Sequence, residues 1–88
     1  MTGRLLDLHG LAAFLDRLAP LSGTVLQEAV VCAALEGGGV FRVTPTGRAV
    51  LTLYRIPASG PSEAEAIAAW ITRARETLAE ARALPACL

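Results

Sequence analysis

The first strong pattern along the chain is a row of apolar residues at helical spacing. Its members recur every three or four positions, and a phenylalanine widens the stripe: Leu8, Leu11, Phe14, Leu15 and Leu18. Asp7 stands where a side chain can cap the first turn, and Pro20 cannot continue a helix. The pattern predicts a helix from about Asp7 to Ala19.

The segment 25–36 is apolar nearly all round, and two structures fit it. Thr24 and Gln27 have the spacing of a capping box, which predicts a helix start, and the glycine run from Gly37 ends the segment. The length of this segment and the capping box at its start favour a second, central helix. The valines and Cys32 would also accept a strand, and the order would then be α-β-β-β-α with a strand over 25–35.

Two alternating segments flank a short turn sequence. Residues 40–44 and 48–56 are rich in strand-forming residues, and the proline and glycine of 45–47 favour a tight turn. We therefore expect a β-hairpin over about 40–56, followed by a loop at 57–61. One predicted face is apolar and the other is mixed: the mixed face carries Val40, Arg42, Val50, Thr52, Tyr54 and Ile56.

A long helix is predicted at the end of the chain. Ser62 and Glu65 form a second capping box, and Pro85 ends a helix of about 62–84. At ~1.5 Å per residue this helix is roughly 33 Å long. Its C-terminal half can overhang the core and pack on another chain, or fold back across the hairpin and helices, which is the more common outcome. Its apolar seam contains Ile67, Trp70, Ile71, Ala74, Leu78 and Ala81.

Together these elements predict one small α+β domain over residues 1–88, with two N-terminal helices, a hairpin and a long C-terminal helix. A chain of 88 residues forms a thin core. The residues expected in that core are Leu11, Leu15, Leu18, Leu26, Val30, Phe41, Leu51, Leu53, Ile67, Ile71 and Leu78.

Composition adds that this thin core cannot bury all of the apolar side chains. The chain is 53% hydrophobic with mean hydropathy +0.50, so we expect apolar surface to meet another protein, most simply a second copy in a homodimer. Eight basic and eight acidic residues balance, which disfavours a nucleic-acid partner. No membrane span or signal peptide is evident, and Cys32 and Cys87 fit free thiols; these features predict a soluble cytoplasmic protein.

Catalytic chemistry has little support in the sequence. His9 is the single histidine, and one histidine with two dispersed cysteines matches no zinc spacing. We expect Cys32 to be buried and inert. The glycine run at 37–39 lacks the Lys and Ser/Thr of a phosphate loop. We therefore predict no enzyme activity, no catalytic residue, no cofactor and no metal.

The leading functional hypothesis is a non-enzymatic protein-binding module that acts by surface occupation. A small regulator, inhibitor or accessory subunit has this profile, as do small inhibitors encoded by phages or other mobile elements. Aromatic and Arg anchors dominate interfaces. The expected contact residues lie on the hairpin and the last helix: Val50, Tyr54, Arg55, Ile56, Trp70 and Leu78.

The alternative hypothesis is DNA binding. Helix, turn, helix and hairpin in this order resemble part of a winged helix, with Arg42 and Arg48 placed to contact phosphate. The helix that would enter the groove offers Glu28 and Glu36 and no basic residue, which opposes this hypothesis. The α-β-β-β-α alternative has the element order of double-stranded-RNA-binding domains, but its last helix begins with acidic residues.

Overall fold

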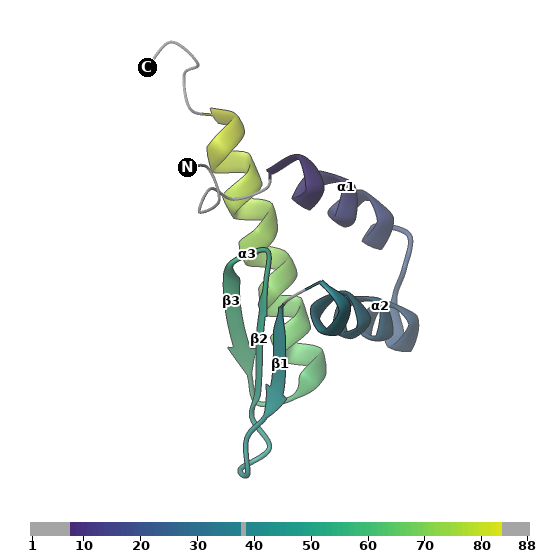
Figure 1. The fold of residues 1–88 in the computed structure, drawn as a ribbon, viewed down its shortest axis with the longest axis vertical. Coiled ribbons are helices and arrows are strands. Elements are labelled where there is room, and N and C mark those ends of the chain that lie inside the picture. The colour runs from purple at the N-terminus through teal and green to yellow at the C-terminus, as the bar shows by residue number, and fades with distance from the viewer. Residues whose placement is uncertain (1–7, 38, 84–88) are drawn as a thin grey trace.

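Three antiparallel strands in the order β1-β2-β3 form a sheet that three helices accompany. The computed structural model describes residues 8–37 and 39–83. The predicted α+β class and element order are confirmed (Figure 1). The elements are α1 (Leu8–Leu18), α2 (Gly23–Glu36), β1 (Val40–Val43), β2 (Ala49–Leu53), β3 (Ile56–Gly60) and α3 (Glu63–Ala83).

Residues 23–36 are helical, so the alternative with a strand over 25–35 is wrong. The predicted capping box is also wrong: Ser22, in extended backbone, occupies the cap, and its side chain makes no capping hydrogen bond. Thr24 lies inside the first turn and is therefore not at a capping position. The first helix forms as expected, although the predicted cap at Asp7 lies outside the described residues.

A second hairpin replaces the long strand predicted over 48–56. β2 ends at Leu53, and Tyr54 and Arg55 both have positive φ, 54° and 63°, as a two-residue type I′ turn requires. Tyr and Arg rarely occupy these positions, so no turn is predicted from the sequence at 54–55. Residues 56–60 consequently form β3, and the prediction of a loop at 57–61 is wrong.

Pro57 can lie within β3 because of its place in the ladder. Leu53 and Ile56 flank the two-residue turn and form a hydrogen-bonded pair. Because hydrogen-bonded and non-hydrogen-bonded pairs alternate, the next pair, Thr52 and Pro57, is non-hydrogen-bonded. The nitrogen of Pro57 therefore faces away from β2, where the missing N–H breaks no ladder bond.

The first hairpin closes as the sequence predicts. Thr44 N–H donates to the carbonyl of Arg48 over 2.7 Å, and Gly47 N–H donates to the carbonyl of Thr44 over 2.8 Å. Gly47 has a φ of +91°, which a residue with a Cβ adopts only with strain.

One face of the sheet is buried against the helices. α3 packs across β3 and β2, α2 packs on β1 and β2, and α1 lies against α3 (Figure 1). Trp70 of α3 is fully buried among these elements. Of the predicted core, Leu11, Leu15, Leu18, Val30, Leu51, Leu53 and Ile67 are buried, whereas Leu26, Phe41, Ile71 and Leu78 are half-buried at its margin.

Two glycines allow the layers to approach closely. A Cβ at Gly39 would lie 2.5 Å from the carbonyl oxygen of Thr52, where the chain leaves α2 and enters the sheet. A Cβ at Gly60 would lie 2.8 Å from the backbone nitrogen of Ala66 in α3. Any larger residue at either position must push two elements apart.

α3 begins as predicted and extends past the core. Glu65 N–H donates to the hydroxyl of Ser62 over 3.3 Å, which confirms the cap at this helix start. Ala74 is the last buried residue in the described part of the helix, and Leu78 beyond it is half-buried. None of the helices in the described part of the chain is long and apolar enough to cross a membrane.

Candidate partner-binding surfaces

The outer face of the sheet is not covered by any helix or strand of the described residues. Side chains paired across the strands share a face, and the two outward rows are Val40, Thr52 and Pro57, then Arg42, Val50 and Ser59. All six side chains of these rows are exposed or half-buried. The described helices pack on the opposite face, so this mixed surface is open to solvent (Figure 1).

β1 is an edge strand of the sheet, and α2 lies beside it (Figure 1). Thr44 N–H donates to the carbonyl of Arg48, the residue directly before β2. By alternation the backbone groups of Arg42 face β2, while those of Phe41 and Val43 face outward. No strand in the described part of the chain pairs with them. The other edge strand, β3, carries Pro57, which natural proteins use to block edge pairing. β1 is therefore the edge that offers both N–H and C=O groups for strand addition.

The exposed large apolar side chains gather on α1, α2 and β1. Among the described residues they are Leu8 (36% exposed), Val25 (59%), Leu35 (68%), Val40 (46%) and Val43 (58%). Val40 and Val43 are three residues apart in β1 and thus project from opposite faces of the sheet. A strand added at this edge would cover both valines at once.

Charge is segregated along the chain, although the total is balanced. Residues 37–62, which contain the whole sheet, carry Arg42, Arg48 and Arg55 and no acidic residue. All eight acidic residues lie in the rest of the chain with the other five arginines. The sheet side of the molecule is therefore locally basic, although the net charge of the whole chain is zero.

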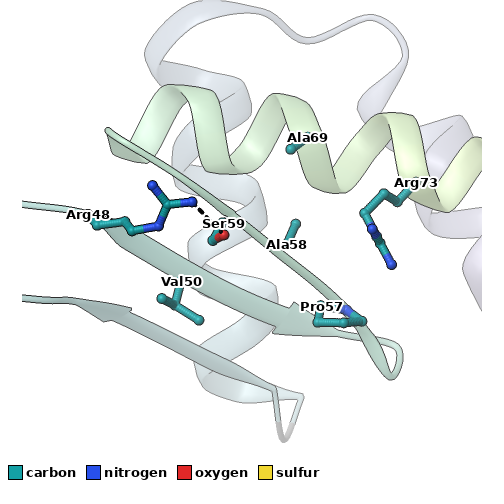
Figure 2. A pocket seen from close by; sticks show the side chains of 7 residues that line it. All are labelled: Arg48, Val50, Pro57, Ala58, Ser59, Ala69 and Arg73. Carbon is teal, nitrogen blue, oxygen red and sulfur yellow. Dashed lines mark hydrogen bonds between the residues drawn. The ribbon is translucent and has the colours of Figure 1, made fainter.

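A groove of about 450 Å³ runs along the β3 side of the sheet. Its lining comes from β2, β3, α3 and the turn before β2: Arg48, Val50, Pro57, Ala58, Ser59, Ala69 and Arg73. Figure 2 shows Arg48 and Arg73 at opposite ends, with the small residues of β3 between them. A guanidinium nitrogen of Arg48 donates to the hydroxyl of Ser59 over 3.2 Å, which orients this arginine over β3.

The structure removes two of the predicted contact residues from the surface. Trp70 is fully buried, and its indole nitrogen donates to the carbonyl of Leu53. Ile56 is only 5% exposed, because the turn at 54–55 places it on the inner face rather than on the predicted outer one. Both residues are core residues, so they cannot anchor a partner in this fold.

The remaining predicted contact residues are dispersed. Val50 lies half-buried on the outer face, and Arg55 is exposed in the second turn. Tyr54 is half-buried with its ring centroid 5.6 Å from that of Phe14, and Leu78 lies on α3. The structure does not bring these four residues together into one patch.

Arg42 and Arg48, the predicted phosphate contacts, are both exposed. Arg42 projects from the outer face of β1, and Arg48 lies at the end of the groove. Glu28 and Glu36 are exposed on α2, the helix that would enter a DNA groove in a winged helix. The acidic side chains on α2 oppose that mode of binding.

Reactive side chains in the described residues are isolated from one another. Cys32 is exposed on α2, which corrects the expectation that it is buried. Its thiol borders a second hollow of about 310 Å³ between α1 and α2. His9 is exposed on α1. Within residues 8–37 and 39–83, no three His, Cys, Asp or Glu side chains are grouped so that they could hold a metal ion.

Comparisons add no relative: no protein-family model, curated protein or solved structure matches the chain. A function for this chain is therefore inferred from the surfaces just described. Sequence reasoning missed the groove beside β3, because it did not predict β3 itself. The alternation of Ile56, Ala58 and Gly60 with Pro57 and Ser59 was the available signal for the missing strand.

Proposed function

We propose that the protein is a non-enzymatic protein-binding module, and that its principal contact surface is the open edge of β1. The observation that carries this proposal is the exposure of Val40 and Val43 on an edge strand whose outward backbone groups are unpaired in the described chain. Strand addition at such an edge is a common mode of protein recognition. A small regulator, inhibitor or accessory subunit can act in this way by occupying a partner's surface.

A second copy of the chain is the simplest partner. Antiparallel pairing of β1 with β1 of another protomer would join the two sheets about a two-fold axis, the symmetry that most homodimers use. The pairing would shield Val40 and Val43 in both protomers. The exposed Val25 and Leu35 of α2 add apolar surface on the helix that packs next to β1.

An affinity capture with matched variants tests this proposal in the native host. Val43→Lys places a charge on the strand edge, a device that natural proteins use against edge pairing. Ala68→Lys adds the same charge at an exposed position of α3 and is the control. We expect proteins that wild type and the Ala68 variant retain, but that the Val43 variant loses. Equal retention by all three would reject β1 as the contact surface.

DNA binding is the second candidate, because Arg42 and Arg48 are exposed on a sheet segment without acidic residues. An electrophoretic shift at low salt tests it. A shift that Arg42→Ala plus Arg48→Ala abolishes would support this candidate. The absence of a shift, or a shift that the two substitutions leave unchanged, would remove it.

A further inference from the structure

We propose that the groove beside β3 binds an extended acidic segment of a partner protein, with its carboxylates paired to Arg48 and Arg73. This inference deepens the proposed function, since it assumes that the protein binds other proteins. It concerns the opposite edge of the sheet from β1, so the two surfaces can be tested separately.

Charge is the first argument for an acidic occupant. Among the described residues, two arginines and no acidic residue line the groove. Arg73 has no ion-pair partner among the described residues, although Glu76 follows one turn later on the same helix. The guanidinium of Arg48 donates to the hydroxyl of Ser59, and no carboxylate from residues 8–37 or 39–83 pairs with it. A planar guanidinium with spare donors matches the geometry of a carboxylate.

The shape of the groove favours an extended chain. Arg48 and Arg73 lie at its two ends, and the residues between them on β3 and α3 are small: Ala58, Ser59 and Ala69 (Figure 2). An occupant that pairs with both arginines therefore needs anionic groups at both ends of the groove. A segment with acidic residues at two positions could reach both arginines while its backbone crosses the small side chains.

The backbone of β3 offers further contacts to such a segment. Pro57 and Ser59 belong to the non-hydrogen-bonded pairs of the β2–β3 ladder, so their backbone groups face the open edge. Ser59 presents an N–H and a C=O there, and Pro57 presents a C=O. The missing N–H of Pro57 excludes a continuous new strand but leaves the bonds at Ser59 available. An extended peptide can therefore contact this edge over a short stretch, with the arginines adding affinity and direction.

Fluorescence anisotropy of a labelled peptide tests the proposal. The probe is a short peptide of alternating glutamate and threonine, and the same peptide with glutamine in place of glutamate is the neutral comparison. We expect binding of the acidic peptide only. Arg48→Ala and Arg73→Ala should each weaken it about tenfold, the scale of an interface anchor. Arg75→Ala removes the same charge from an exposed position of α3 that does not line the groove, and it should leave binding unchanged.

Several outcomes would overturn the proposal. They are equal binding of the glutamine peptide, equal weakening by the Arg75 variant, or binding that Arg48→Ala and Arg73→Ala do not alter. Tight binding of pyrophosphate or duplex DNA without binding of the acidic peptide would also overturn it, in favour of a phosphate ligand. Melting temperatures of the variants confirm that each is folded. Val43→Lys should bind the peptide normally, so failure of the β1 proposal and failure of this one are distinguishable.

Discussion

The indole nitrogen of Trp70 donates a hydrogen bond to the backbone carbonyl of Leu53 over 3.0 Å. This bond joins the middle of α3 to the last residue of β2, directly before the Tyr54–Arg55 turn. Phe14 of α1 meets the same indole edge-to-face at 5.8 Å between ring centroids. Trp70, which the sequence predicted to contact a partner, thus connects α3 to both the sheet and α1.

Replacing Trp70 with phenylalanine should therefore destabilise the fold. The change removes buried volume and leaves the Leu53 carbonyl without its indole donor, at a cost of about 2 kcal/mol in the free energy of unfolding. Urea denaturation followed by circular dichroism measures it. Thr72→Ala, at an exposed position of the same helix, should change stability by less than about 0.5 kcal/mol. Similar losses in the two variants would contradict the role assigned to Trp70.

Gly60→Ala should also be costly, for a different reason. The new Cβ would lie 2.8 Å from the nitrogen of Ala66, and backbone on both sides must move, which costs roughly 1–3 kcal/mol. Thr72→Ala, the exposed substitution on the same helix α3, is again the comparison, because it disturbs no close backbone contact. Thermal unfolding should separate the two variants clearly. A Gly60 variant as stable as wild type would show that β3 and α3 are not closely packed there.

Arg55→Gly is expected to stabilise the second hairpin. Arg55 has a φ of 63°, a conformation that glycine adopts freely and that other residues adopt at a cost of roughly 1–3 kcal/mol. Relief of that strain should raise the midpoint of urea denaturation, by about 1 kcal/mol in stability after the larger chain entropy of glycine is subtracted. A lowered midpoint would mean that the side-chain interactions of Arg55 outweigh its backbone strain.

The thiol of Cys32 should react with Ellman's reagent in the folded protein. It is exposed on α2, so labelling needs no unfolding. The measurement is made in a Cys87→Ser background, which leaves one thiol to count. Rapid labelling without denaturant is expected, together with a stability change below about 0.5 kcal/mol for Cys32→Ser. Labelling that occurs only in denaturant would contradict the exposed position.

The sequence predicted those parts of the fold that local chemistry determines. The leucine spacing of α1, the turn at 45–47 and the cap at Ser62 all depend on neighbouring residues, and all three are present. The turn at 54–55 was missed because Tyr54 and Arg55 adopt positive φ without the glycine or asparagine that usually marks it. Because this turn was not predicted, β3 was missed and Ile56 was assigned to the outer face of the sheet instead of the inner one.

The candidate sites depend on relationships that no local pattern contains. β1 remains an edge strand because β3 pairs with β2 and not with β1. The groove combines Arg48, Ser59 and Arg73, which are distant in the sequence and meet through the sheet and α3. Which side of a helix faces the core is likewise decided by tertiary packing. For this reason the sequence alone allowed Trp70 to be assigned either to the core or to an interface.

Light scattering coupled to size-exclusion chromatography measures whether the protein associates with itself through the edge of β1. At high micromolar concentration we expect wild type to have the mass of a dimer that dissociates on dilution. Val43→Lys should remain a monomer at every concentration, and Ala68→Lys should behave as wild type. A wild-type protein that stays monomeric at high micromolar concentration, or a Val43 variant that dimerises as wild type does, would contradict self-association through the edge of β1.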